Sequence, residues 1–389
     1  MCFQRDRRDD TPMRSGRITK WIGGLTATTV LGGFASMVHA DGGQFYGLMR
    51  ERDLTPLGFM RLDMRPAHAV STEPGSWAIE NDMAFQNTWA ISPEVEKYLT
   101  GLEAAGRRKL GPEDVQAIRD LPGENYLVDL EAAVYDVTVH YKLAKDWSAY
   151  LGASAVSYRG GFMDGAIESF HDAFGFSSFG RPAVARNRVN MVFDLKGSDY
   201  VRLDGGTSGG LLDPVLGLRY SSPQRLNGWN FTVEGAVKVP VAGQRDFLST
   251  GRLDVGVQAS AQHRGARNAF YIDTAAVWYG GGQAPSPQER QIVPTLVLGY
   301  ERRLTARTNL NLQGYISPSM YTRQETSLRE LRATKYQMTL GLRHRVASHL
   351  WTIGITENLQ NVNNTPDIGF QLGYAFVPRF SRPRLDDIL

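Results

Sequence analysis

The sequence predicts an all-β protein: a transmembrane, antiparallel, up-and-down β-barrel of about twelve strands, with short helices in its long outer loops. Three observations lead to this prediction: strand-length runs of alternating polarity, an N-terminal export signal, and a regular alternation of long and short links. In residues 336–343 and 368–376, apolar side chains recur at every second position. That period places apolar side chains on one face of a strand and polar side chains on the other. In a membrane barrel the apolar face meets lipid and the polar face surrounds a lumen.

The composition fits a membrane barrel better than a helical membrane protein. The 389 residues are 42% hydrophobic, and the mean hydropathy is −0.31. No window of about 18 residues is apolar and free of polar interruptions, so the sequence excludes a transmembrane helix. A soluble β-sandwich would also alternate, but its strands typically have about 5–6 residues, whereas most runs here have about ten or more.

Residues 1–40 have the pattern of a signal peptide. Arg14, Arg17 and Lys20 precede a weakly apolar stretch, and small residues then offer a cleavage site after Ala40. Cleavage would remove six basic and three acidic side chains, which lowers the formal net charge from +3 to 0. A neutral mature chain has no overall basic field, so nucleic-acid binding is not expected. The one cysteine, Cys2, lies in this segment, so no structural disulfide is expected.

The exported chain is predicted to have three parts. Residues 41–75 have mixed charge, contain three prolines and lack sustained alternation, which predicts an irregular N-terminal arm, periplasmic or lumenal. The outer-membrane barrel is predicted over residues 76–377. Residues 378–389 are predicted to be a C-terminal tail.

The first barrel strand is predicted at residues 76–91, where Trp77 and Trp89 stand near the two ends of one apolar row. Two lipid-facing tryptophans at this separation match the two aromatic belts of a membrane barrel. The remaining strands are predicted at residues 126–142, 147–158, 211–221, 229–240, 251–262, 268–279, 291–302, 308–317, 334–345, 350–357 and 367–377.

Two short helices are predicted in the first long link. Ser92 and Pro93 are helix-start signals, and apolar residues then recur at helical spacing as far as Leu102. A second helix is predicted from Pro112 to Leu121, because Pro-Gly follows it.

Long and short links alternate between the predicted strands. Residues 92–125 and 159–210 are long links, whereas residues 143–146 and 222–228 are short. Bacterial barrels have the same asymmetry between long outer loops and short periplasmic turns. Aromatic residues flank the short links and are predicted to form the periplasmic belt: Tyr141, Trp147, Tyr220, Trp229 and Tyr300.

Charges of both signs occupy the polar face of the predicted strands. These lumen-lining candidates are Asp213, Arg219, Glu234, Lys238, Arg252, Asp254, Asp273, Glu301, Lys335 and Arg343. Interspersed charges can fill a narrow barrel with hydrogen-bonded ion pairs, or they can line a weakly selective aqueous path. The sequence leaves both alternatives open, and no single charge marks a site.

The most distinctive loop is GGFMDGAIESFHDAFGF, residues 160–176. Its predicted helix carries Met163, Asp164, Ile167, Glu168, Phe170, His171, Asp172 and Phe174. The apolar members form one stripe at helical spacing, and the polar members gather on the opposite side. The helix is predicted either to constrict the barrel mouth or to lie on the membrane surface.

Glu168, His171 and Asp172 are weak candidates for catalysis or metal binding. Glu168 and His171 are three residues apart and share a helix face, so they could form an acid–base pair. A dedicated metal site would need further nitrogen or sulfur ligands, and neither HExxH nor clustered histidines occur. The alternative is a solvated helix face. We therefore predict no metal, no cofactor and no enzyme activity.

The GGFMD…ESFHDAFGF loop, the helical loop before Pro122-Gly123-Glu124 and the repeated amphipathic strands together resemble an uncharacterised family. It is a family of predicted Gram-negative outer-membrane β-barrels of unknown function, and the resemblance covers most of the mature chain. It implies the compartment and the fold, and it carries no reaction, substrate or site residue. Barrels of this class commonly end near an aromatic residue; Phe376 or Phe380 fits that role, and a polar tail follows.

These observations predict an outer-membrane protein of a Gram-negative bacterium that forms a narrow channel or a solute-binding barrel. Its expected partners are outer-membrane lipid, the barrel-assembly machinery and a small solute. The first alternative is a lipid-modifying enzyme that uses the Glu168, His171 and Asp172 helix. The second is a structural or adhesive barrel whose helical loop, residues 93–121, docks a partner.

Overall fold

The structure is a computed structural model that describes residues 44–53, 58–66, 74–222, 228–243, 247–280, 291–360 and 368–377. The predicted signal peptide and C-terminal tail lie outside these residues, as does Phe380.

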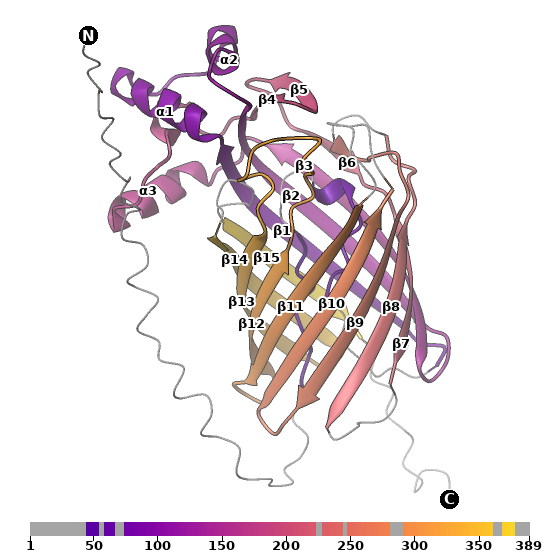
Figure 1. The fold of residues 1–389 in the computed structure, drawn as a ribbon. Helices are drawn as coiled ribbons and strands as arrows, with labels where there is room; N and C mark the ends of the chain where they lie inside the picture. Colours follow the sequence, from indigo (N-terminus) through magenta and orange to yellow (C-terminus); the bar gives the residue numbers. More distant parts are fainter. Residues whose placement is uncertain are drawn as a thin grey trace, which may run out of the picture. The chain divides into compact units, whose positions relative to one another are not determined.

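Twelve strands of the described chain close into a ring (Figure 1). They are β1 (Trp77–Ile91), β2 (Asn125–Lys142), β3 (Trp147–Arg159), β7 (Val215–Ser221), β8 (Trp229–Lys238), β9 (Asp254–Arg264), β10 (Asn268–Tyr279), β11 (Gln291–Arg303), β12 (Thr308–Ser317), β13 (Lys335–Val346), β14 (His349–Gln360) and β15 (Ile368–Phe376). Each strand pairs antiparallel with the next in this series, and β1 pairs with β15, as Phe85 does with Phe370. Closure leaves no free sheet edge, which is the condition for a sheet in lipid.

Eleven of the predicted strands are confirmed, with ends that differ by at most three residues. The strand predicted at residues 211–221 is wrong at its start, because β7 begins at Val215. Pro214 has no N–H to donate to the ladder, and Leu212 packs in the interior with Phe59 and Met60.

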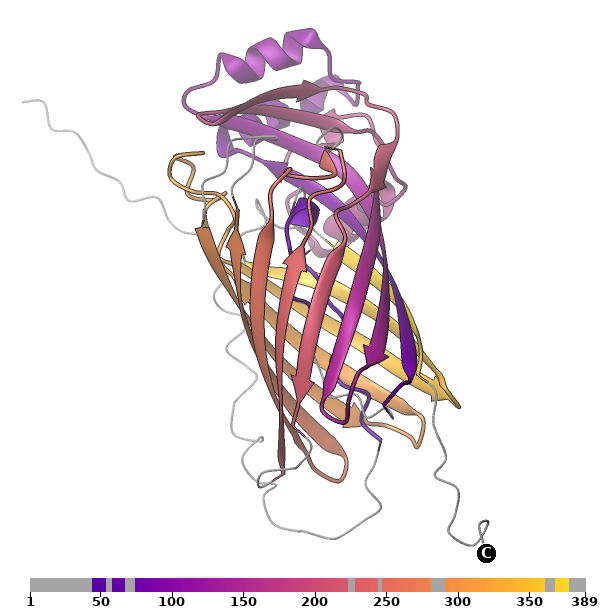
Figure 2. The ribbon, with the colours of Figure 1, turned by 90° about the vertical axis from the view of Figure 1, so that its right-hand side faces the viewer.

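Three short strands in the long link between β3 and β7 were not predicted. β4 (Asn190–Leu195) pairs with the outer end of β2, and β5 (Ser198–Arg202) pairs with β4. β6 (Ser208–Leu211) pairs with the outer end of β3. These strands extend the wall beyond the ring on one side (Figure 2).

Aromatic side chains gather at the end of the barrel that carries the short turns. The ring centroids of Trp77 and Tyr141 are 4.5 Å apart, and those of Trp147 and Tyr220 are 5.2 Å apart. Such a row is typical of the interfacial belt of a membrane barrel.

The prediction that Trp89 faces lipid is wrong. Its side chain is 5% exposed, and its Nε1 donates a hydrogen bond of 2.9 Å to the carbonyl oxygen of Phe179. The guanidinium of Arg181 lies 5.1 Å from the centre of the Trp89 ring. Loop segments therefore cover the outer end of β1.

Helices of the long loops lie at the opposite end from the short turns (Figure 1). They are α1 (Pro93–Leu102), η3 (Glu103–Ala105), α2 (Pro112–Arg119), α3 (Asp164–Phe174) and η4 (Arg181–Ala183). Val95 and Leu99 of α1 and Ile118 of α2 pack against Leu127 and Val192 on the outward face of the sheet. Among the residues that the structure describes, no helix has the length and apolar character to cross a membrane.

The described parts of the N-terminal arm lie inside the barrel. They are residues 44–53 and 58–66, which include the short helix η2 (Gly58–Met60). Figure 2 shows η2 near the outer rim and the same indigo chain continuing down the interior. Leu48 packs with Tyr271, Val297 and Tyr315, whose side chains come from β10, β11 and β12.

Candidate functional site

The candidate site is the contact between the arm and the charged wall of the lumen. Nine of the ten predicted lumen residues are at most 5% exposed: Asp213, Arg219, Glu234, Lys238, Asp254, Asp273, Glu301, Lys335 and Arg343. Arg252 is the exception, and its assignment to the lumenal row is wrong. It is exposed and precedes β9, because the strand begins three residues later than the predicted position 251.

Four arginines of the arm form ion pairs with acidic side chains of the wall. The pairs are Arg50 with Glu80 (3.6 Å), Arg52 with Asp136 (2.8 Å), Arg61 with Asp254 (3.3 Å) and Arg65 with Asp136 (3.3 Å). One further pair has the charges reversed, with the basic residue on the wall: Lys335 of β13 pairs with Asp53 of the arm. Buried charges of this kind are tolerated only when they are paired, so each contact fixes the arm against the wall.

Two wall residues also hold the backbone of the arm. Glu301 accepts hydrogen bonds from the N–H groups of Tyr46 (2.9 Å) and Gly47 (3.1 Å). Arg343 Nη1 donates to the carbonyl oxygens of Tyr46 (2.8 Å), Gly47 (3.0 Å) and Leu48 (2.8 Å). The wall thus satisfies polar backbone groups that an irregular segment inside a barrel could not satisfy by itself.

Further up the barrel, Lys238 and Asp254 contact the second arm segment. Lys238 Nζ donates to the carbonyl oxygen of Met60 at 2.9 Å and forms an ion pair of 3.0 Å with Asp213. Asp254 accepts from the N–H of Leu62 at 3.0 Å. The arm is therefore bound at two levels of the lumen.

The other predicted lumen residues serve the wall itself. Arg219 Nε lies 2.6 Å from Glu234, whose second oxygen accepts a hydrogen bond of 2.7 Å from Tyr150. Asp273 accepts a hydrogen bond of 2.9 Å from Gln258. The two sequence alternatives were ion-pair filling and an aqueous path, and these contacts correspond to the first.

Glycines on the lumenal face make room for apolar side chains of the arm. A Cβ atom added to Gly299 of β11 would lie 3.2 Å from Leu48 Cγ. One added to Gly341 of β13 would press against Met49, but it would also lie 2.7 Å from the backbone carbonyl oxygen of Ile353 in β14. A larger residue at Gly299 would therefore exclude the arm from its present path, whereas one at Gly341 would also distort the wall.

A cavity remains beside the arm on the β2–β3–β8 side. Its volume is about 40 Å³, and its lining includes Arg50, Arg52, Asp136 and Lys238. A water molecule needs roughly 10–15 Å³, so the cavity has room for about three. With the arm in this position, the cavity is far too small for a sugar or an amino acid.

Several residues that contact the arm were not among the predicted lumen-lining residues. Glu80 and Asp82 of β1 and Asp136 of β2 lie on the polar rows of their strands, so the alternation signal was present. The sequence did not show what these carboxylates bind. Their partners are four arginines in a segment without periodicity, and nothing in that segment indicates where it lies.

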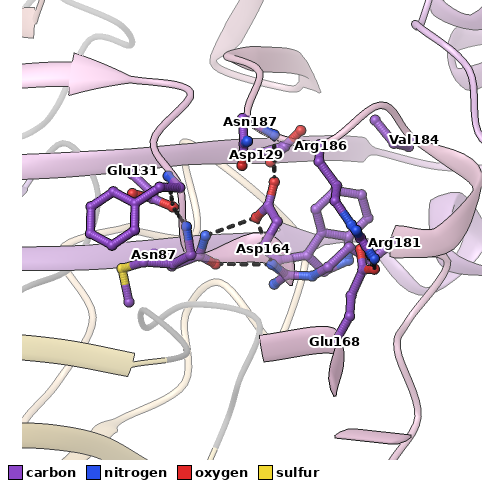
Figure 3. Close-up of polar contacts among 12 residues, drawn as sticks. Asn87, Asp129, Glu131, Asp164, Glu168, Arg181, Val184, Arg186 and Asn187 are labelled. Carbon is purple, nitrogen blue, oxygen red and sulfur yellow. Dashed lines mark hydrogen bonds and ion pairs between the residues drawn. The ribbon is translucent and has the colours of Figure 1, made fainter. Parts of the chain in front are cut away.

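Helix α3 lies outside the barrel and not in its mouth (Figure 1), and its polar contacts reach the outward face of the wall (Figure 3). Asn87 and Glu131 pair across β1 and β2, on the same rows as the outward-facing Trp77 and Tyr141. Asn87 Nδ2 donates to Asp164 of α3 at 3.0 Å, and Glu131 accepts from the N–H of Phe162 at 2.9 Å. Of the two predicted positions, constriction of the mouth is therefore wrong.

The candidates Glu168, His171 and Asp172 do not form a site with one another in the described structure. Both oxygens of Glu168 bind arginines: Arg107 Nη2 at 2.9 and 2.8 Å, and Arg186 Nε at 3.0 Å. Burial raises the pKa of Glu168, but hydrogen bonds from Arg186 and the charge of Arg107 outweigh burial and hold the pKa below its ordinary value. A carboxylate engaged in this way is a poor general base.

His171 lies among aromatic rings, and Asp172 is exposed. The His171 ring is 6.1 Å from that of Phe176 and 6.5 Å from that of Phe179. Within the described ranges, no group of three or more His, Cys, Asp or Glu side chains could hold a metal ion. The apolar stripe is also divided: Met163 and Ile167 are buried, whereas Phe170 and Phe174 are exposed.

Comparison with solved structures identifies the fold. An outer membrane channel from Pseudomonas putida F1 is similar, with a TM-score of 0.50 and 12% identity over 80% of this chain and 99% of that chain. The NanC porin (TM-score 0.40, 7% identity, 77% and 99% covered) and the P. putida toluene transporter TodX (0.39, 8%, 80% and 92%) are less similar. At these identities the likeness concerns the fold, which is that of outer-membrane β-barrels.

Comparison with curated proteins gave no match. A family model matches residues 122–377, which span β2 to β15. The chain therefore belongs to the family described as "Protein of unknown function (DUF3187)".

Proposed function

We propose that this protein is an outer-membrane channel for small polar solutes and that its N-terminal arm closes the lumen at rest. The observation that carries the proposal is the double attachment of the arm, by ion pairs to the wall and by backbone hydrogen bonds to Glu301 and Arg343. A barrel of about twelve strands is wide enough for a narrow path once such a segment leaves. With the arm bound, the lumen is filled.

The polarity of the wall favours a polar solute. The arm-facing side chains of β12 and β13 include Asn311, Gln313 and Thr339, which bond to the arm's backbone or to Glu51. When the arm leaves, these groups need new partners, and water or a hydrogen-bonding solute can supply them. An apolar solute could not.

The proposal also covers the export of the chain and its insertion into the outer membrane. We propose that residues 1–40 are removed after Ala40, that the barrel-assembly machinery inserts the chain, and that outer-membrane lipid surrounds it. The aromatic row at the short-turn end supports the periplasmic orientation of that end. N-terminal sequencing of the protein purified from outer membranes tests the cleavage site.

The test of the function is single-channel recording in planar bilayers. Wild-type protein is expected to give rare openings, and a variant that lacks residues 44–66 is expected to give a steady conductance. A second variant, in which Arg302→Met changes an exposed arginine of β11, serves as the control and is expected to behave as wild type. A deletion variant that migrates as a folded barrel and carries no current would contradict the proposal.

A further inference from the structure

We propose that α3 and the residues that flank it anchor the barrel in the outer leaflet of the membrane through Phe162, Phe170, Phe174 and Phe176. This inference does not depend on conduction. It concerns a lipid-binding surface outside the barrel, beside the cluster of Figure 3.

The four phenylalanines are unusually exposed for side chains of this size. Their exposed fractions are 71% for Phe162, 53% for Phe170, 65% for Phe174 and 56% for Phe176. Three of them form one patch, because the Phe170 ring is 4.7 Å from Phe174 and 6.0 Å from Phe176. A contiguous aromatic patch of this kind marks an interaction surface.

Buried polar contacts fix the orientation of this patch. Asp164 at the start of α3 accepts hydrogen bonds of 3.0 Å from Asn87 and from Arg181, and its second oxygen accepts one of 2.7 Å from the N–H of Asn187. One turn later, Glu168 binds Arg107 and Arg186. Figure 3 labels Glu168 and Arg186 beside the contacts of Asp164. These two carboxylates thus fix α3 in place, while Phe170 and Phe174 on the same helix stay exposed.

The height of the patch along the barrel can be worked out from β1. Trp77 belongs to the aromatic row at the short-turn end, and Asn87, on the same outward row, is ten residues further on. Ten residues at about 3.3 Å span roughly 33 Å, and a strand tilt of about 40° reduces this to roughly 25 Å along the barrel axis. The apolar band of an outer-membrane barrel is about 25 Å tall, so Asp164 is held at its outer limit.

The lipid-facing surface of the wall reaches the point at which α3 is attached. Directly before Asn87 on the outward row stands Phe85, which pairs with Phe370 of β15, and Phe370 is 44% exposed. Figure 1 shows α3 beside this rim, below α1 and away from the barrel axis. Membrane lipid that surrounds the barrel contacts Phe370, and the same lipid layer reaches the phenylalanines of α3. Aromatic rings are favoured at this depth, where the acyl chains meet the headgroups.

The chain permits a clean depth measurement because Cys2 is its one cysteine. In a Cys2→Ser background, Phe174→Cys and Ser169→Cys each carry a nitroxide label in the full chain. Residue 169 is the matched control, because it is also exposed but lies on the other flank of α3, next to Asp172. Leu340→Cys, on the outward face of β13 and 46% exposed, marks the lipid environment. The folded proteins are reconstituted in phosphatidylcholine–phosphatidylglycerol vesicles, and relaxation by oxygen is compared with relaxation by a water-soluble nickel chelate.

The expected result is that the label at 174 resembles that at 340: several-fold more accessible to oxygen than the label at 169 and shielded from nickel. Equal nickel accessibility at 174 and 169 would overturn the inference, because the patch would then lie in water. Shielding of 174 from both reagents would overturn it as well, because a protein surface would then cover the patch.

Discussion

Leu48 of the arm occupies the space that Gly299 leaves on the lumenal face of β11. Leu48 is fully buried, and its Cγ would lie 3.2 Å from a Cβ atom at position 299. The small size of Gly299 is what lets Leu48 lie against β11, so this pair helps to fix the path of the arm.

This relationship gives the first prediction. Gly299→Leu places a side chain where Leu48 now lies, so the arm must leave its path. Overpacking typically costs about 1–3 kcal/mol, which corresponds to a roughly 5- to 150-fold increase in the undocked population. Single-channel recording is expected to show more frequent openings.

Gly314→Leu is the control for this change. Gly314 also lies in a strand, but no atom outside its own neighbours lies within 4 Å of an added Cβ. Openings as rare as in the wild type are expected. If both leucine variants opened to the same extent, displacement of Leu48 would not be the cause.

The second prediction concerns Arg343, which binds three consecutive carbonyl oxygens of the arm. Arg343→Met removes these bonds, and hydrogen bonds to a charged group contribute about 1.5–3 kcal/mol each. The arm is therefore expected to undock at least tenfold more often. Trypsin then gains access to Arg50 and Arg52, and cleavage there is expected to be correspondingly faster than in the wild type.

Arg267→Met provides the comparison, because Arg267 is exposed in the turn between β9 and β10. Its cleavage rate is expected to equal that of the wild type. An Arg343→Met protein that resists trypsin as well as this control would show that the arm does not depend on Arg343.

The third prediction is an acid-induced release of α3. The folded-state pKa of Glu168 lies below its ordinary value, so its contacts with Arg107 and Arg186 stabilise the loop above that ordinary pKa. This stabilisation is lost as the pH falls through the lowered, folded-state pKa, where Glu168 becomes protonated. A label at residue 169 is expected to become more mobile over that acidic range.

Glu168→Gln is expected to be mobile at neutral pH already and to lack the acid transition. Asp172→Asn, which changes an exposed carboxylate on the same helix, is expected to retain it. An unaltered transition in Glu168→Gln would assign the pH dependence to another group.

The wall of the barrel could be predicted from the sequence because its signal is local. Alternation in runs such as that of β13 fixes both the strand and the face of each residue. β4, β5 and β6 were missed because they are only four to six residues long; β4 and β6 pair with the outer ends of β2 and β3, and β5 pairs with β4. In β4, burial on both faces also removes the alternation. Trp89 was assigned to lipid because its row faces outward, but loop segments cover it.

Only the wall side of the candidate site was predicted from the sequence, and the arm side was not. The alternation placed Glu301 and Arg343 on the polar row, but it could not show that both bind backbone atoms more than 250 residues earlier in the chain. The arm has no periodicity, because its conformation is set by the wall and not by its own sequence. Glu168 was likewise found, but its role was not, since Arg107 and Arg186 lie in other parts of the loops.

The most direct test of the closed lumen is a reversible lock on the arm. In the Cys2→Ser background, Leu48→Cys and Gly299→Cys are expected to form a disulfide, because the Cγ position of Leu48, where a cysteine sulfur would lie, is 3.2 Å from the Cβ position at 299. Single-channel recording of this protein is expected to show no openings while the disulfide is intact and openings after reduction. Current that is equal before and after reduction would contradict the account, because a tethered arm would then leave the path open.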